Sequence, residues 1–199
     1  RLSVFDHIDS GVSTYTYLGF PASTRKKSIK YRIVDNVTDP HDAEDGSETL
    51  LKLNQCFLTY NPLGRTPQIC DERSLEFTFG VTGSPHKLVK KHLKTWGSIL
   101  TESPESKLVI KTTYSEDPEF REYIFRYLKC HRSVRDRVLF AEKMTRNEHM
   151  RWFNTIDLVL DTFPYNGTTS TFESLVMGCP VVTLAGVVHR ARVGASILS

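Results

Sequence analysis

The amino-acid sequence predicts an α/β fold whose second part is a parallel sheet with helices on both faces. Beyond residue 74, short apolar segments alternate with segments of helical length, and each parallel connection needs such a crossover. Hydrophobic residues make up 39% and charged residues 25% of the 199 residues. This composition is typical of a packed globular protein.

The first part of the chain predicts short strands and irregular connections. Residues 15–18 and 29–34 are aromatic and β-branched, and the turn at residues 19–24 separates them. The acidic stretch after Pro40 predicts a short helix over residues 42–53, and residues 56–60 are apolar and strand-like. Residues 61–74 are rich in proline, glycine and charge without periodicity, which indicates a linker.

The second part predicts a regular order of strands and helices. Strands are expected at residues 75–81, 108–111, 138–140, 156–160 and 181–184. Helices are expected at residues 85–100, 118–130, 146–154 and 170–177, and residues 190–199 read like the opening of another. This order predicts a Rossmann-like sheet, and the Arg1 start together with this last segment suggests a fragment of a longer chain.

Charge and cysteine content exclude several classes of function. The formal net charge of +3 arises from 26 basic and 23 acidic residues, which does not favour binding to nucleic acid. The four cysteines form no Cys-x-x-Cys pair and have no histidine at metal-ligand spacing. No apolar run approaches the ~20 residues that a transmembrane helix needs. We expect no metal and no membrane span, and a reduced cytoplasmic or nuclear location.

The loop after the predicted strand 156–160 is the first candidate site. Gly167 is followed by the hydroxyl residues Thr168, Thr169 and Ser170 at the start of a predicted helix. A helix N-terminus offers free backbone N–H groups and the positive end of the helix dipole, which suits a phosphate. The alternative is that these residues only cap the helix and form a turn.

The second candidate site follows the predicted strand 75–81. Ser84 suits the N-cap of the next helix, Pro85 suits its first position, and Lys87 falls in its first turn. A cation at that position opposes the helix dipole unless an anion docks beside it. Alternatively, Lys87 is one more solvated charge of a basic helix.

The third candidate site starts the predicted helix 146–154. Thr145 and Glu148 have the spacing of a capping box, which accounts for both residues structurally. Arg146 and His149 lie one turn apart on the same helix face, where they could flank a ring or a phosphate. A lone histidine is more often structural.

These loops carry a resemblance to a known family. The runs 160–169 (LDTFPYNGTT), 173–186 (ESLVMGCPVVTLAG) and 192–198 (RVGASIL) closely resemble the donor-site signature of the O-linked N-acetylglucosamine transferase and SPINDLY family. Upstream, FTFG at 77–80 falls into register, and GFPAST at 19–24 resembles the end of that family's first catalytic lobe. The similarity covers nearly the whole chain.

The resemblance implies a two-lobed glycosyltransferase of the GT-B type. Such an enzyme transfers a sugar from a nucleotide diphosphate to Ser or Thr of acceptor proteins, with inversion and without a metal or other cofactor. Residues 1–60 would be the end of the first lobe, 61–74 the linker, and 75–199 the truncated nucleotide-sugar-binding lobe. Upstream tetratricopeptide repeats would belong to the full-length protein, and this part alone would be inactive.

The resemblance also assigns roles to individual residues. Lys87 matches the lysine that stabilises the departing diphosphate, and Glu173 matches an acidic position that binds the ribose. The hydroxyl run 168–170 matches the phosphate site, while Arg146 and His149 match positions that hold the base and sugar-phosphate. We expect Ser84 and Thr145, which lie beside these residues in the candidate loops, to contact the nucleotide sugar as well.

Two nucleotide sugars are candidates for the donor. UDP-N-acetylglucosamine is the first expectation and GDP-fucose, the donor of SPINDLY-type members, is the second. The chain departs from the family at residues 82–84 (TGS), where an Asn- or Gln-containing segment is common. This departure keeps open a third hypothesis, an inactive nucleotide-binding or interaction module.

Overall fold

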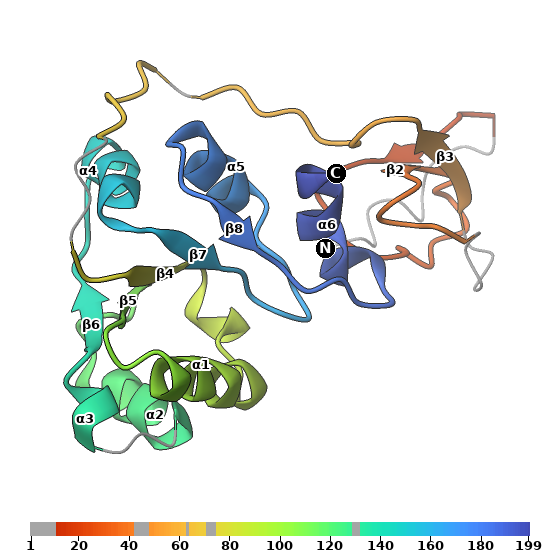
Figure 1. The fold of residues 1–199 in the computed structure, drawn as a ribbon. Helices are drawn as coiled ribbons and strands as arrows, with labels where there is room; N and C mark the ends of the chain where they lie inside the picture. The colour runs from red at the N-terminus through yellow and green to blue at the C-terminus, as the bar shows by residue number, and fades with distance from the viewer. Residues whose placement is uncertain (1–10, 42–47, 63, 71–74, 129–131) are drawn as a thin grey trace. The chain divides into compact units, whose positions relative to one another are not determined.

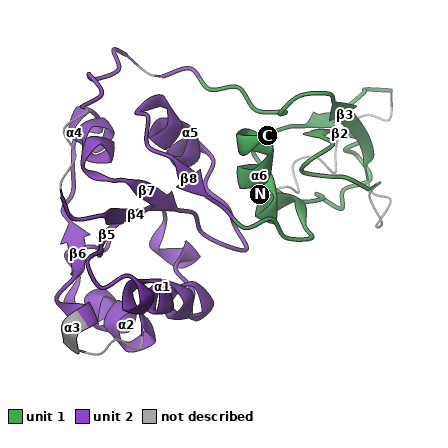
Figure 2. Cartoon of the chain, viewed as in Figure 1, with its two compact units in different colours: residues 1–60, 184–199 green, residues 61–183 purple. Residues whose placement is uncertain are grey.

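The computed structural model describes residues 11–41, 48–62, 64–70, 75–128 and 132–199. The chain divides into two compact units, residues 1–60 with 184–199 and residues 61–183 (Figure 2). The boundary after Tyr60 coincides with the expected start of the linker. Residues 184–199, which we expected with the second unit, pack instead with the first. The assignment of both units to lobes of an enzyme stays a prediction.

The second unit contains a five-stranded parallel sheet in the order β6-β5-β4-β7-β8 (Figure 1). Its strands are β4 (Thr78–Thr82), β5 (Lys107–Lys111), β6 (Val138–Ala141), β7 (Leu158–Leu160) and β8 (Val181–Val182). The segments between them are η2 (Pro85–Lys87), α1 (Lys90–Glu102), α2 (Pro118–Leu128), α3 (Arg132–Arg135), α4 (Arg146–Trp152), η3 (Phe153–Thr155) and α5 (Thr169–Val176). The chain proceeds from β4 to one side and returns to β7 on the other, so the loops after β4 and β7 flank the switch point, where ligands bind in such sheets.

Helices cover both faces of this sheet because alternate residues of a strand point to opposite faces. Leu108 and Ile110 of β5 pack in a core cluster with α1 and α2, whereas Val109 packs with the cluster formed by α4, η3 and residues near the end of α5. Figure 1 shows α1 and α2 on one side of the strands and α4 and α5 on the other. The predicted α/β fold class is confirmed.

Two glycines permit close approach in this packing. A Cβ at Gly97 of α1 would lie 2.0 Å from the carbonyl oxygen of Leu128 at the end of α2. A Cβ at Gly80 of β4 would lie 2.6 Å from the Ile156 side chain and 3.1 Å from that of Trp152. Both positions therefore exclude any side chain without movement of the neighbouring element.

The first unit contains a three-stranded parallel sheet in the order β1-β2-β3. The strands are β1 (Tyr15–Thr16), β2 (Tyr31–Asp35) and β3 (Thr49–Leu53). The C-terminal segment contributes η4 (His189–Ala191) and α6 (Val193–Leu198) to this unit. The helix expected near the C-terminus is thus present.

Two predicted elements of the first unit were wrong. The helix expected over residues 42–53 is a strand at its end, because residues 49–53 pair with β2 along its full length; residues 42–47 lie outside the described part. Residues 56–60 form no strand. The backbone of Phe57 bonds to side chains instead, since its N–H donates to Asp35 Oδ2 (2.9 Å) and its carbonyl accepts from the Tyr17 hydroxyl (2.8 Å).

The helix predicted over residues 85–100 is divided into two. Pro85–Lys87 form a short 3-10 helix, and α1 begins only at Lys90. Val89 between them is extended, with φ −90° and ψ 156°, and Leu88 is buried. Burial of Leu88 in the core cluster accompanies this break, and the break sets Lys87 apart from the basic helix to which the sequence assigned it.

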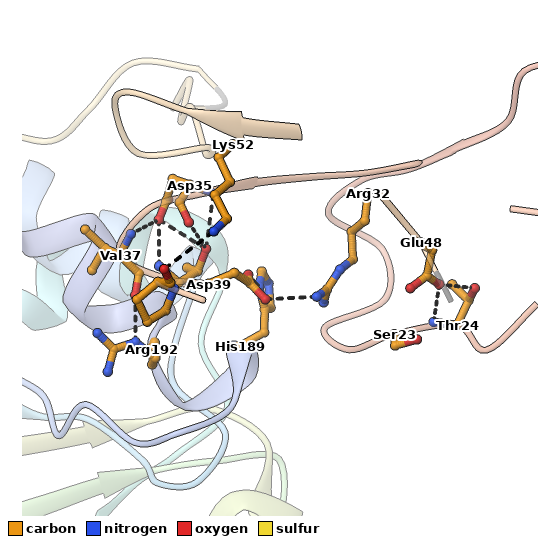
Figure 3. Close-up of polar contacts among 12 residues, drawn as sticks. Ser23, Thr24, Arg32, Asp35, Val37, Asp39, Glu48, Lys52, His189 and Arg192 are labelled. Atoms are coloured by element: carbon orange, nitrogen blue, oxygen red, sulfur yellow. Dashed lines mark hydrogen bonds and ion pairs between the residues drawn. The ribbon is translucent and has the colours of Figure 1, made fainter. Parts of the chain in front are cut away.

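A buried polar network ties the C-terminal segment to the first unit (Figure 3). Asp39 accepts from Arg32 at 2.9 Å and lies 2.6 Å from Nδ1 of His189. Arg192 donates from Nε to the carbonyl of Val37 at 2.6 Å. Burial alone would raise the pKa of Asp39, but the hydrogen bond and charge of His189 and the charge of Arg32 outweigh it, so the pKa is lowered.

We predict that Asp39→Asn destabilises the first unit by about 3–5 kcal/mol, because it removes one partner of a buried charged pair. The lowered pKa means that the wild-type contribution is complete above about pH 4 and is lost as the pH falls through the folded-state pKa. Hydrogen exchange of peptides from β2 at neutral and acidic pH measures the effect. The exposed Asp136→Asn is the matched control, and equal exchange in the two variants would contradict the prediction.

Candidate functional site

The loop after β7 is organised by one carboxylate. Asp161 Oδ1 accepts from the backbone N–H of Thr162 (2.8 Å) and of Gly167 (2.6 Å), while Oδ2 accepts from the Thr183 hydroxyl (2.7 Å). Burial raises the pKa of Asp161, although these hydrogen bonds and the charge of Lys87 act in the opposite direction. The carboxylate therefore closes the loop on itself and joins it to the segment after β8.

Lys87 reaches this loop from the opposite side of the switch point. Its ammonium donates to the carbonyl of Asn166 at 2.9 Å and lies 4.0 Å from the centroid of the Tyr165 ring. Burial lowers the pKa of Lys87, and the charge of Asp161 opposes this shift. The sequence left open that Lys87 was a solvated charge of a basic helix. It is instead half-buried against the loop, and the first two candidate sites lie together.

The hydroxyl run opens α5 at the same place. Thr168 occupies the N-cap position but makes no side-chain capping hydrogen bond. Capping by Thr168 therefore does not account for this run. Helix α5 begins at Thr169. The backbone N–H groups of its first turn, which include those of Thr169 and Ser170, have no partner within the helix. Together with Lys87, they form a group of hydrogen-bond donors that we call the anion crevice.

The third candidate site is centred on Glu173 of α5. Its carboxylate lies 2.9 Å from Arg146 and 3.0 Å from Nε2 of His149, and its side chain is 7% exposed. Burial would raise the pKa of Glu173, but the hydrogen bonds and charges of His149 and Arg146 outweigh it, so the pKa is lowered. Glu173 is thus held ionised between two side chains of α4. The sequence positions of the three residues did not predict these contacts.

The remaining predicted site residues, Thr145 and Ser84, lie at the starts of helices. Thr145 caps α4 through a complete capping box with Glu148, as the spacing predicted. Its backbone N–H and hydroxyl both lie within hydrogen-bond distance of the Glu148 carboxylate. Ser84 stands at the N-cap of η2 without a side-chain capping bond. Contact of Ser84 and Thr145 with a nucleotide sugar stays a prediction.

A pocket of about 440 Å³ opens beside His149 at the carboxyl ends of β4, β5 and β6. Gly83 with φ +142° lines it after β4, Lys111 lines it at the end of β5, and Glu142 lines it after β6. No atom lies within 4 Å of a Cβ built on Gly83, so the space there is open. We call this cavity the strand-end pocket.

Sequence reasoning missed several residues of this region. Lys111 was not singled out because a lysine at a strand end has no distinctive motif. Tyr165 and Asn166 were noted only as part of the loop, and their contacts with Lys87 depend on a segment 78 or 79 residues away. A search for charged residues at the carboxyl end of every predicted strand would have found Lys111.

Comparison with known proteins identifies the family. Residues 83–199 match the family model described as glycosyl transferase family 41. The chain belongs to this family. It is 36% identical over 189 residues to the "Probable UDP-N-acetylglucosamine-peptide N-acetylglucosaminyltransferase SPINDLY" of Arabidopsis thaliana, covering 92% of this chain and 21% of that protein. It is 27% identical over 195 residues to the SEC protein of the same organism, which bears the same enzyme name, covering 92% of this chain and 20% of SEC.

The solved structures include a similar fold over nearly the whole of this family 41 chain. A Thermobaculum terrenum O-GlcNAc transferase, the mutant K341M, matches with a TM-score of 0.87 and 28% identity, covering 94% of this chain and 36% of that one. The chain spans about a fifth of the length of the curated relatives that it matches. The predicted membership of the family is confirmed.

Two kinds of feature are absent from the part of the chain that the structure describes. No helix in this part of the family 41 chain is long and apolar enough to cross a bilayer. No group of three or more His, Cys, Asp and Glu side chains there is arranged to hold a metal ion.

We predict that Gly167→Ala destabilises the second unit by about 1–3 kcal/mol, because the added methyl overpacks the loop. Its Cβ would lie 2.7 Å from the hydroxyls of Ser170 and Thr171 and 3.1 Å from Asp161 Oδ1. Denaturant unfolding followed by tryptophan fluorescence reports on this unit, because both tryptophans of the chain lie in it. Gly19→Ala, with its nearest atom at 3.8 Å, is the control, and wild-type stability of Gly167→Ala would refute the packing argument.

Proposed function

We propose that this chain carries the donor-binding part of a protein O-glycosyltransferase. The enzyme transfers N-acetylglucosamine from UDP-N-acetylglucosamine to Ser or Thr of proteins, with inversion and without a metal. The observation that supports this most is the position of Lys87, whose ammonium lies on the loop that leads into α5. The membership of family 41 and the names of its relatives support the same reaction class.

The anion crevice suits a diphosphate leaving group. As the bond between sugar and β-phosphate breaks, negative charge develops on the phosphate oxygens. The Lys87 ammonium and the first-turn N–H groups of α5 are already oriented toward that charge, which is the basis of electrostatic catalysis. An arriving diphosphate also favours the charged form of Lys87 and so offsets the effect of burial on its pKa.

The carboxylate of Glu173 suits the ribose. An ionised carboxylate accepts hydrogen bonds and cannot donate them, so it binds hydroxyl groups such as those of a ribose. Arg146 and His149 fix its orientation and hold it ionised. Arg146 is 40% exposed and so retains surface that can contact the base or a phosphate.

GDP-fucose is the alternative donor. It shares the diphosphate and the ribose with UDP-N-acetylglucosamine, so the anion crevice and Glu173 serve both. The two donors differ in the base and the sugar, and the affinities of UDP and GDP measured by calorimetry distinguish them. An inactive binding module is the remaining alternative, and the placement of Lys87 against the loop disfavours it.

We predict that Lys87→Met in the full-length protein lowers the transfer rate at saturating donor about 10²–10³-fold, as loss of one preorganised stabiliser does. Methionine keeps the length and the apolar stem of lysine, so the thermal unfolding midpoint should change little. Lys91→Met, at an exposed position of α1, is the matched control. Wild-type turnover by Lys87→Met would eliminate Lys87 from the reaction.

We also predict that nucleoside diphosphate binding does not depend on a divalent cation. Mg²⁺ binds carboxylates whose negative charge is not already neutralised, but Asp161 is bonded to its own loop and the charge of Glu173 is paired with Arg146. Titration calorimetry with and without EDTA measures this directly. A collapse of UDP and GDP affinity in EDTA would require a metal site and would overturn the proposed electrostatic role of Lys87.

A further inference from the structure

Lys111 is a partly buried cation that the proposed mechanism does not use. It ends β5, the strand that pairs with β4 through the register Thr82 with Lys111. Lys111 lines the strand-end pocket together with Thr112, Glu116 and His149. Among the residues that the structure describes, its ammonium forms no ion pair and no hydrogen bond, and only the charge of Glu173 acts on it.

The charged form of Lys111 is unfavourable at this position when the pocket holds no ligand. Burial lowers the pKa of Lys111, and the charge of Glu173 only partly opposes this shift. The opposite end of the same strand differs, because Lys107 there is paired with Glu76. A desolvated ammonium without a hydrogen-bond acceptor is costly, so an acceptor supplied by a ligand in the pocket would be favoured.

We propose that Lys111 is a specificity-determining residue that donates a hydrogen bond to a carbonyl oxygen of the donor's nucleobase. This inference rests on the proposed function, because it assigns the base of the same nucleotide to the strand-end pocket. It adds a residue from the end of β5, which neither the motifs nor the crevice includes.

The three parts of a nucleotide find three adjacent places. The diphosphate fits the anion crevice around Lys87, and the ribose fits Glu173. His149 bonds to Glu173 and also lines the strand-end pocket, so the pocket begins where the ribose site ends. Lys111 lies close enough to Glu173 to be influenced by its charge. A base attached to that ribose therefore enters the space that Lys111 faces.

The chemistry of lysine selects among the bases. An ammonium only donates hydrogen bonds. Uracil presents O4 and guanine presents O6 as acceptors, whereas cytosine and adenine carry an amino group at the corresponding positions. The carboxylates of Glu116 and Glu142 in the same pocket can accept from any of the four bases and do not discriminate in this way. Lys111 should therefore favour UDP over CDP and GDP over ADP.

The test is titration calorimetry on the full-length protein with UDP, CDP, GDP, ADP and inorganic pyrophosphate. Whichever of UDP and GDP binds the wild-type protein more tightly is the reference ligand. We expect Lys111→Met to weaken the affinity for this ligand at least tenfold. The variant should also lose the preference for UDP over CDP, or for GDP over ADP. Pyrophosphate affinity should stay unchanged. Lys111→Arg, which keeps the donors, should retain the preference. Lys107→Met, at the other end of β5, is the matched control and should behave as wild type.

The other outcomes would overturn the role of Lys111 in base recognition, and one of them would overturn the proposed function as well. Wild-type affinity and preference in Lys111→Met would overturn the role of Lys111 and leave the proposed function standing. An equal loss of pyrophosphate affinity would place Lys111 at the phosphates and overturn its role in base recognition. Failure of every nucleoside diphosphate to bind the wild-type protein would overturn the proposed function and this inference with it. If Lys111→Met fails to fold by circular dichroism, loss of the base preference in a folded Lys111→Arg variant would refute the proposal.

Discussion

The candidate site depends on the buried carboxylate of Asp161. Its two oxygens hold the N–H groups at both ends of the loop after β7 and the Thr183 hydroxyl beyond β8. This closure holds the loop in which the Asn166 carbonyl accepts from Lys87, directly before the first turn of α5, where Thr168 makes no side-chain cap. Without it, the cation from the β4 loop would lack its acceptor on the β7 loop. Asp161 therefore acts on the site through the loop that it closes.

Asp161 and Glu173 are both buried carboxylates, but their surroundings give them different functions. Burial raises the pKa of Asp161, and the dipoles around it only partly offset this effect. Glu173 is also buried, but Arg146 and His149 contact it directly and lower its pKa. A carboxylate that bonds to the backbone of its own loop serves structure, whereas Glu173 is kept ionised by the side chains that contact it and can still accept from a ligand hydroxyl.

The parallel sheet explains why residues from distant segments meet. β4 lies between β5 and β7, so the loops after these strands come to one edge although about 80 residues separate Lys87 from Asn166. The glycines at positions 80 and 97 allow the helices to pack closely on the two faces. Parallel pairing holds the strand ends side by side, and Gly83 leaves open space where the pocket begins.

The sequence by itself determined the alternation of strands and helices in the second unit, because apolar runs of strand length and crossover segments are local patterns. It also determined the capping box of Thr145 and the three candidate loops, since helix starts depend on neighbours within one turn. It failed at residues 49–53 and 56–60, where the outcome depended on pairing with β2 and on the Asp35 carboxylate. Only the tertiary structure decided that Lys87 lies on the Asn166 carbonyl, that Glu173 is held between Arg146 and His149, and that Lys111 faces a pocket. Those contacts join residues from different crossovers, and no local propensity specifies which strand ends become neighbours.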